Sequence, residues 1–415
     1  MNKILSTLFL TFFCLSLFAQ KPLQYFRLND QRGINVFETT KEDTVGYNGF
    51  KVRIGGDFAM QFQSLNQTNF QDSLVMLGSD FNLPTANLNL DVQMLDGVRL
   101  HLRTYLSSRH HPESWVKGGH IQFDKLDFIK PGFLEKIMNV TTIRIGLDEF
   151  NYGDAHFRRT DNARAIYNPF AENYIMDSFS TEAFGEITVQ KNGLLAVIGL
   201  TNGKLNQSVV VNSSSDNKVS FFGKLGYDNQ LNDDLRLRLT GSWYINQGTT
   251  NGNWLYGGDR GGARYYFVMH HVSTGGSDFE GRFNPRFNQM TALQFNPFVK
   301  FKGLEFFGIY ELVLNSQDEG NGSFTQIAAE LLFRFGKREQ FYVGGRYNLV
   351  TGKTNENAET QSINRINAGL GWFITKNIVA KLDYVNQNYE DDGWVGSKYN
   401  GGKFDGIVLE AVIGF

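Results

Sequence analysis

Basic side chains recur at alternate positions in many short stretches of the chain, and rows of this kind can attract and bind anions. Arg99 and Arg103 are four residues apart and Arg236 and Arg238 are two apart, so in an extended strand each pair lies on one face. The candidate row residues are Arg53, Arg99, Arg103, Arg144, Arg236, Arg238, Arg346 and Arg365. Acidic residues on the same rows are fewer, which predicts a weak anion preference in a space that these rows line. Alternatively, the charges pair across neighbouring strands and only solvate a wall.

A second concentration of charge lies in the segment 148–180, where charged and aromatic residues are mixed. Its charged residues include Asp154, Arg158, Arg159, Asp161 and Arg164. Long connections in compact structures are usually functional or disordered, and the many aromatic residues here argue against disorder. We therefore expect a functional segment. It folds either into an internal space or outward, as a cap or a docking site for a partner.

Sequence patterns of common enzymes and metal sites are missing. The chain has no Gly-x-Ser-x-Gly, no His-Glu-x-x-His and no Gly-x-x-x-x-Gly-Lys pattern. The adjacent histidines at 110–111 and at 270–271 would point to opposite sides of a strand and chelate poorly. The net charge of -2 suggests no nucleic-acid partner. We expect no enzyme, no metal and no cofactor.

The elements that would position these residues are strands with a period of two. The clearest are 50–63, 86–94 and 98–103, the last two joined by a tight turn at Asp96-Gly97. Further strands are predicted at 115–126, 140–148, 181–190, 194–201, 218–228, 235–246, 287–301, 304–313, 324–335, 340–350, 362–373, 378–386 and 406–415. After the first residues no apolar run approaches the ~20 residues of a helical span, so a membrane protein of this sequence would be a barrel.

Short and long connections alternate along this series of strands. Long ones cover 64–82, 149–180, 247–286 and 387–403, whereas 127–139 is the one long connection on the short side. The pattern predicts an all-β fold, a transmembrane antiparallel up-and-down β-barrel with short periplasmic turns and long extracellular loops. We expect about 16 strands, or 18 if Tyr265–Met269 forms a strand pair, and a barrel of this size leaves an aqueous channel.

The amino-terminal residues have the pattern of a signal peptide. Asn2 and Lys3 precede an apolar run from Ile4 to Phe18, and Ala19 is a small residue at the expected cut. The expected organisation is a signal peptide at 1–19, a periplasmic N-terminal segment at 20–48 and the barrel at 49–415. The one cysteine, Cys14, would leave with the signal peptide, so the mature chain would carry no thiol.

The last ten residues alternate as a membrane strand and end on Phe415. This ending resembles the terminal strand of outer-membrane proteins, in which a final Phe marks the chain for the barrel assembly machinery. The architecture of the whole mature chain resembles the porin superfamily, and 148–180 resembles a porin constriction loop in position and chemistry. The resemblance implies that Arg158, Arg159 and Arg164 face Asp154 and Asp161 across a constriction. It also implies an outer-membrane location.

The function expected from this resemblance is a channel for passive diffusion of small hydrophilic solutes with a weak anion preference. Outer-membrane lipid and the solutes would be its partners, with a homo-oligomer or an outer-membrane protein complex left open. One alternative is a non-catalytic barrel that serves as a subunit or platform of an assembly or secretion complex. Another is a hydrophobic-substrate channel similar to fatty-acid transporters, with an amino-terminal hatch, although the basic rows weigh against apolar cargo.

Overall fold

The protein is a closed barrel of sixteen antiparallel strands in which the first strand pairs with the last. The computed structural model describes residues 22–43, 45–108, 113–160, 164–206, 208–212, 216–248, 255–259, 261–315 and 320–415. The expected signal peptide lies outside these residues. No helix in the described part of the chain is long and apolar enough to cross a membrane.

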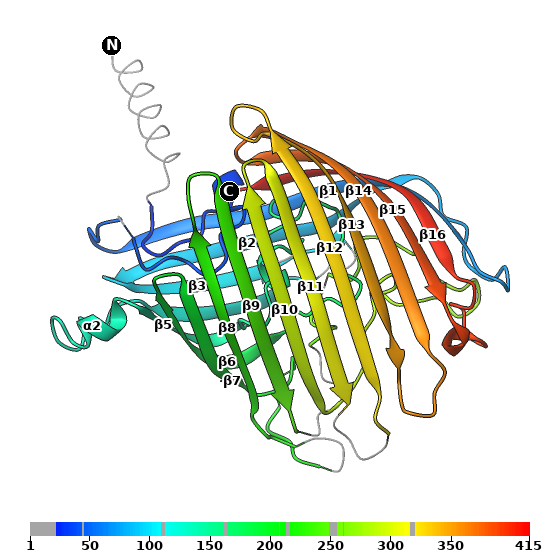
Figure 1. Ribbon diagram of the computed structural model, residues 1–415, viewed down its shortest axis with the longest axis horizontal. Coiled ribbons are helices and arrows are strands. Elements are labelled where there is room, and N and C mark those ends of the chain that lie inside the picture. Colours follow the sequence, from blue (N-terminus) through cyan, green and yellow to red (C-terminus); the bar gives the residue numbers. More distant parts are fainter. Residues whose placement is uncertain are drawn as a thin grey trace, which may run out of the picture.

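The strands follow one another around the barrel in sequence order (Figure 1). They are β1 Lys51–Thr68, β2 Asp80–Leu95, β3 Val98–Tyr105, β4 Trp115–Phe123, β5 Thr141–Glu149, β6 Thr181–Lys191, β7 Leu194–Thr201, β8 Ser220–Gln230, β9 Leu235–Asn246, β10 Met290–Phe301, β11 Leu304–Asn315, β12 Ser323–Phe335, β13 Phe341–Lys353, β14 Gln361–Thr375, β15 Ile378–Glu390 and β16 Lys403–Gly414. A short helix, α2 Glu135–Met138, lies in the β4–β5 connection.

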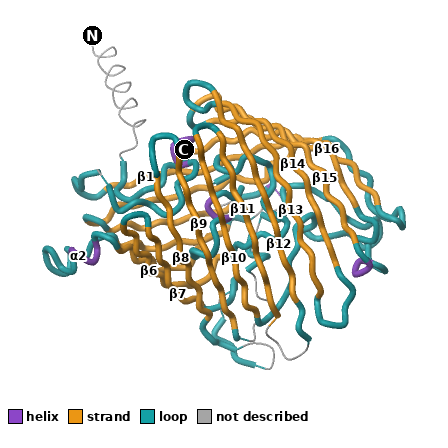
Figure 2. Tube along the Cα trace, viewed as in Figure 1, coloured by secondary structure: helices purple, strands orange, loops and turns teal. Residues whose placement is uncertain are grey.

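The prediction of a sixteen-stranded antiparallel barrel is confirmed, and the alternative of eighteen strands is wrong. Tyr265–Met269 forms a bend and turns instead of a strand pair, and its residues Tyr265, Val268 and Met269 are buried against the inner wall. Several strands are longer than the sequence pattern indicated, β1 and β2 most of all, since their pairing continues beyond the apolar stretch. Figure 2 shows the strands as a continuous wall with loops at both ends and inside.

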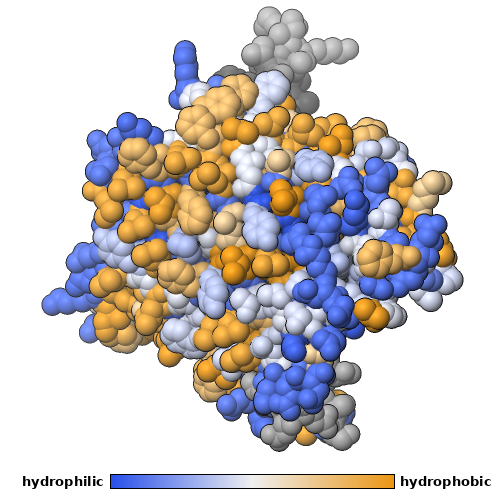
Figure 3. Space-filling view, turned by 45° about the vertical axis from the view of Figure 1, so that its right-hand side comes forward, coloured by the Kyte–Doolittle hydropathy of each residue, from blue (hydrophilic) through white to orange (hydrophobic). Residues whose placement is uncertain are grey.

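The two faces of each strand have opposite character, with the apolar face outside. On β12, Leu331 and Phe333 are half exposed, whereas Glu330 is 1% exposed and lies inside the barrel. This inverts the pattern of a soluble protein and suits a wall that contacts lipid. Apolar side chains cover much of the surface in Figure 3, and hydrophilic residues gather at its lower end.

Barrel closure places the carboxyl terminus against the first strand. Phe415 and Gly56 exchange two backbone hydrogen bonds of 3.0 and 3.1 Å, while the Phe415 side chain stays 42% exposed. Because the strand number is even, both ends of the barrel chain emerge on the side of the short turns, which is the periplasmic side in such barrels.

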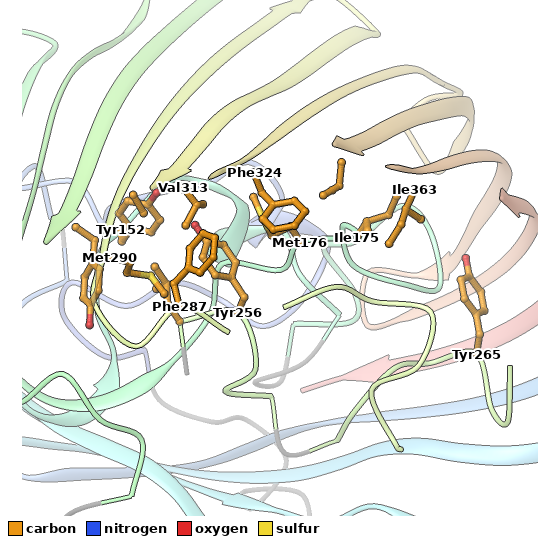
Figure 4. Packing of buried hydrophobic residues seen from close by; sticks show 14 of the residues in the cluster. Tyr152, Ile175, Met176, Tyr256, Tyr265, Phe287, Met290, Val313, Phe324 and Ile363 are labelled. Atoms are coloured by element: carbon orange, nitrogen blue, oxygen red, sulfur yellow. The ribbon is translucent and has the colours of Figure 1, made fainter. Parts of the chain in front are cut away.

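The interior is packed rather than empty. Three stretches enter it: the N-terminal segment (22–43 and 45–48), the first inserted segment (149–160 and 164–180), and the second inserted segment (255–259 and 261–287). Aromatic and aliphatic residues of the two inserted segments pack against inward-facing wall residues in one cluster, as Figure 4 shows for Tyr152, Tyr256 and Phe324. Phe37 of the N-terminal segment packs in a separate cluster with Phe157 and Phe298.

Candidate functional site in the barrel lumen

The first inserted segment lies inside the barrel and is held there by the polar inner face of the wall. All its described residues are buried except Arg164, which is half-buried. The backbone N–H of Ile175 donates to Asn348 Oδ1 at 2.7 Å, and that of Met176 donates to Gln326 Oε1 at 2.9 Å. The segment has no regular secondary structure to satisfy its backbone N–H groups, so side chains of the wall accept these hydrogen bonds instead.

Asp154 anchors the start of this segment to strands β8 and β9. Its carboxylate accepts hydrogen bonds from Lys224 Nζ, Arg238 Nε and Thr240 Oγ1, each at 2.8 Å. Burial raises the pKa of the Asp154 carboxyl, but Arg238 and Lys224 outweigh burial and hold this pKa well below its usual range. Asp154 is therefore an anion at neutral pH.

Arg158 ties the segment to the neighbouring part of the wall, at β11 and β12. Its guanidinium donates to Glu305 at 2.9 Å and to Glu330 at 2.5 Å, and it also contacts Asn35 of the N-terminal segment. Burial lowers the pKa of Arg158, but the two glutamates raise it by a larger amount, so the net shift of the pKa is upward. Three separate parts of the chain meet at this one cation.

Arg159 belongs to an ion cluster that joins the two inserted segments. Its Nη2 lies 2.6 Å from Asp177 and 2.9 Å from Asp259. Arg282 contacts Asp177 and Asp259 as well, and it pairs with Glu172 at 2.9 Å. Sequence reasoning missed Glu172, Asp177 and Arg282, because nothing in their local pattern shows that the two segments meet.

Arg164 and Asp161 are the two remaining residues that were expected to line a constriction. Arg164 pairs with Glu149 and donates to the backbone oxygen of His156 at 2.8 Å. Asp161 lies outside the described residues. Of the described candidates, the structure brings Arg158 near Asn35 and Asp154 near Arg238, but each arginine has its own carboxylate partner, so they form no single row facing Asp154.

The eight row arginines lie inside the barrel, and each has a polar partner. Arg53 and Arg99 contact Asp91, Arg103 contacts Asp148, Arg144 contacts Glu186, Arg236 contacts Asp228, Arg238 contacts Asp154 and Glu38, Arg346 contacts Glu330, and Arg365 donates to Gln387. Some pairs join neighbouring strands, as in the alternative that the charges pair across the wall. Others join the wall to the inserted segments.

The N-terminal segment closes part of the periplasmic mouth. The N–H of Gln31 donates to the Lys376 oxygen at 2.7 Å, and Asn35 Nδ2 donates to Glu305 at 2.6 Å. Glu38 reaches the interior and pairs with Arg238 at 2.7 Å and with Lys224 at 3.3 Å. Burial raises the pKa of Glu38, but Arg238 and Lys224 lower it to about 2. No sequence pattern distinguished Glu38 from other residues of this polar segment.

Two spaces remain on the periplasmic side of the filled lumen. A cavity of about 150 Å³ lies between the N-terminal segment, the first inserted segment and the wall of β1 to β6. Its lining mixes basic residues, among them Arg27, Arg99 and Arg103, with the carboxylates of Glu38, Asp91, Asp148, Glu149 and Glu186. The Nε atoms of Arg99 and Arg103 have no hydrogen-bond partner among the described residues. A wider hollow of about 1080 Å³ lies at the mouth itself.

The histidine pairs build no metal centre in the described part of the chain. His270 contacts the Ser277 oxygen and His271 contacts Ser273, while the pair at 110–111 lies outside the described residues. Among the described residues, no group of three or more potential ligands could hold a metal ion.

Comparisons of the sequence with known protein families and with curated proteins find no match. The structure, however, resembles solved outer-membrane barrels. In-vitro folded OmpT, an outer membrane protein of Vibrio cholerae, has 8% identity and a TM-score of 0.53, covering 89% of this chain and 99% of its own. The anion-selective porin from Comamonas acidovorans has 10% identity and a TM-score of 0.53, covering 88% and 100%.

A third such structure is the outer membrane channel DcaP of Acinetobacter baumannii, with 10% identity and a TM-score of 0.53 over 89% of this chain and all of DcaP. At these identities the likeness concerns the fold. The closed barrel, its apolar outer face and this likeness define a transmembrane β-barrel with the fold of outer-membrane porins.

Proposed function

We propose that this barrel is a narrow, non-catalytic channel for small hydrophilic solutes, with a weak preference for anions. The observation that carries the proposal is the charge of the periplasmic hollow. Its basic lining residues are Arg32, Arg236, Lys300, Lys302, Arg334, Lys337, Arg338 and Lys376, against the acidic residues Asp233, Asp234 and Glu339. An excess of cations around a polar opening raises the local concentration of anions.

The inserted segments would set the size limit. Asp154 ties the first inserted segment to β8 and β9, Arg158 ties it to β11 and β12, and the ion cluster of Arg159 ties it to the second inserted segment. A solute must pass between these tethered segments and the wall, so only small solutes fit. The polar cavity of about 150 Å³ beside the first inserted segment would be a stopping point on this path.

The test is the reversal potential of purified protein in a planar bilayer under a salt gradient. The variant Lys337→Glu with Arg338→Glu reverses two exposed charges at the hollow and should shift selectivity toward cations. A control is Lys191→Glu, which reverses an exposed lysine at the same end of the barrel that does not line the hollow. An equal shift in both variants, or in neither, would contradict the proposal.

The filled lumen favours a second candidate, a barrel that does not conduct and serves as a subunit or platform of an outer-membrane complex. The N-terminal segment and both inserted segments occupy space that is open in a wide pore. A protein that folds but gives no current steps, with and without residues 22–48, would support this second function over the first.

The proposed partners of this channel are the barrel assembly machinery and further copies of the same chain. The exposed Phe415 at the end of the barrel is available for recognition by the barrel assembly machinery. OmpT of Vibrio cholerae also has a trimer form, with 8% identity to this chain. We therefore retain a homo-oligomer as the proposed assembly, which chemical cross-linking in native membranes would detect.

A further inference from the structure

The β4–β5 connection, residues 124–140, is an unusual periplasmic connection because it is long and apolar. Other turns on this side are tight, such as those between β6 and β7 and between β10 and β11. Here the chain leaves the wall, forms α2 and returns, and Figure 1 shows it projecting outward from the barrel beside β5.

The connection exposes five large apolar side chains. Their exposed fractions are 50% for Phe128, 57% for Ile129, 37% for Phe133, 45% for Leu134 and 54% for Ile137. Five large apolar side chains exposed to water on so short a segment would favour aggregation. On soluble proteins such patches usually mark an interaction site. The segment nonetheless has a defined conformation.

Its own hydrogen bonds hold the segment in shape. The N–H of Phe133 donates to the Lys130 oxygen at 2.9 Å, and that of Met138 donates to the Leu134 oxygen at 2.9 Å. The Gly132 N–H donates to Asp127 Oδ1 at 2.7 Å. Met138 is buried at the base of the segment, at 3% exposure. The apolar side chains are therefore presented by a fixed scaffold.

The apolar side chains continue the lipid-facing surface of the barrel. The Phe128 ring lies 5.9 Å from that of Phe123, at the end of β4. Phe123 pairs in register with Ile143, and Ile145, two residues farther along β5, is 52% exposed on the outer wall. The neighbouring Gln122 and Asp124 are buried, so Phe123 points outward. The patch is thus joined to a face that contacts lipid.

We propose that the β4–β5 connection docks in the periplasmic leaflet of the outer membrane, at the boundary between acyl chains and headgroups. Phe128, Ile129, Phe133, Leu134 and Ile137 enter the acyl region. The exposed Lys130 and Lys136 reach the phosphate groups above them, as basic residues do in segments that lie in a membrane interface. The segment would fix the height and tilt of the barrel wall on the β4–β5 side.

Site-directed spin labelling in phospholipid vesicles tests this docking. Single cysteines are placed at Phe133→Cys and Ile137→Cys in the full chain carrying Cys14→Ser, so that the introduced thiol is unique. Power saturation compares collisions of the nitroxide with oxygen, which enters lipid, and with a water-soluble nickel chelate. Leu331→Cys, half exposed on the outer wall, is the lipid control, and Lys337→Cys, on a periplasmic turn, is the water control.

We expect an oxygen-to-nickel accessibility ratio at positions 133 and 137 severalfold above that of Lys337→Cys and near that of Leu331→Cys. Glu135→Cys, on the other side of α2, should give a lower ratio than Ile137→Cys. High nickel accessibility at 133 and 137 would place the segment in water. Low accessibility to both reagents would show a protein contact, with a second copy or another partner. Either result would overturn the proposal.

Discussion

Replacing Asp154 by Asn should destabilise the filled lumen strongly, because it leaves two cations buried without their shared anion. Asn keeps the shape of the side chain and can still accept the hydrogen bond from Thr240. At 2.8 Å and an effective dielectric constant of about 20, each lost ion pair represents an attraction of about 6 kcal/mol before desolvation is counted. Since Glu38 still faces Lys224 and Arg238, we expect a net loss of about 3–5 kcal/mol.

The assay is urea unfolding of the protein in lipid vesicles, followed by tryptophan fluorescence and by gel mobility without heating. Asp233→Asn, at an exposed turn, is the matched control and should change the free energy of unfolding little. Adding Lys224→Met to Asp154→Asn should restore part of the loss, because Lys224 and Arg238 then no longer share Glu38 as their remaining carboxylate. A loss below about 1 kcal/mol for Asp154→Asn is typical of exposed ion pairs and would show that water fills the lumen at Asp154.

Three further predictions concern the N-terminal segment, the first inserted segment and the wall. Deleting residues 22–48 should increase single-channel conductance, because it removes Glu38 and Asn35 from the interior; unchanged conductance would mean that they do not limit the path. Burial lowers the pKa of His156 to about 4, so docking of the first inserted segment should weaken as pH falls from 6.5 to about 4, and limited proteolysis should show this loss in the parent protein and not in His156→Gln. Acid weakens docking because the imidazole of His156 takes up a proton at a higher pH in the released segment than in the buried one. Leu90→Arg, on the outer face of β2, should cost roughly 2–4 kcal/mol in the same urea assay, and normal stability would reverse our assignment of the two faces.

The sequence by itself determined the barrel and the direction of each face, and it narrowed the strand number to 16 or 18. The period of two is a local property, so Leu331 and Glu330 face opposite ways whatever the rest of the chain does. Strand order also follows from the sequence, because short turns force consecutive strands to pair. The outward position of Phe415 is fixed in the same way.

Only the tertiary structure decided what fills the barrel. Arg238 meets Glu38, 200 residues away, and Asp154, 84 residues away, and no local pattern encodes either contact. The connection 247–286 was expected to be an extracellular loop, yet much of its described part lies inside because Asp259 and Arg282 pair with the first inserted segment. Counting charges on the inward rows left open whether the arginines stay free in a pore or pair with carboxylates, and the structure pairs most of them. A charged residue has the same local sequence whether water or a buried carboxylate neutralises it, so its partner depends on how distant segments fold together.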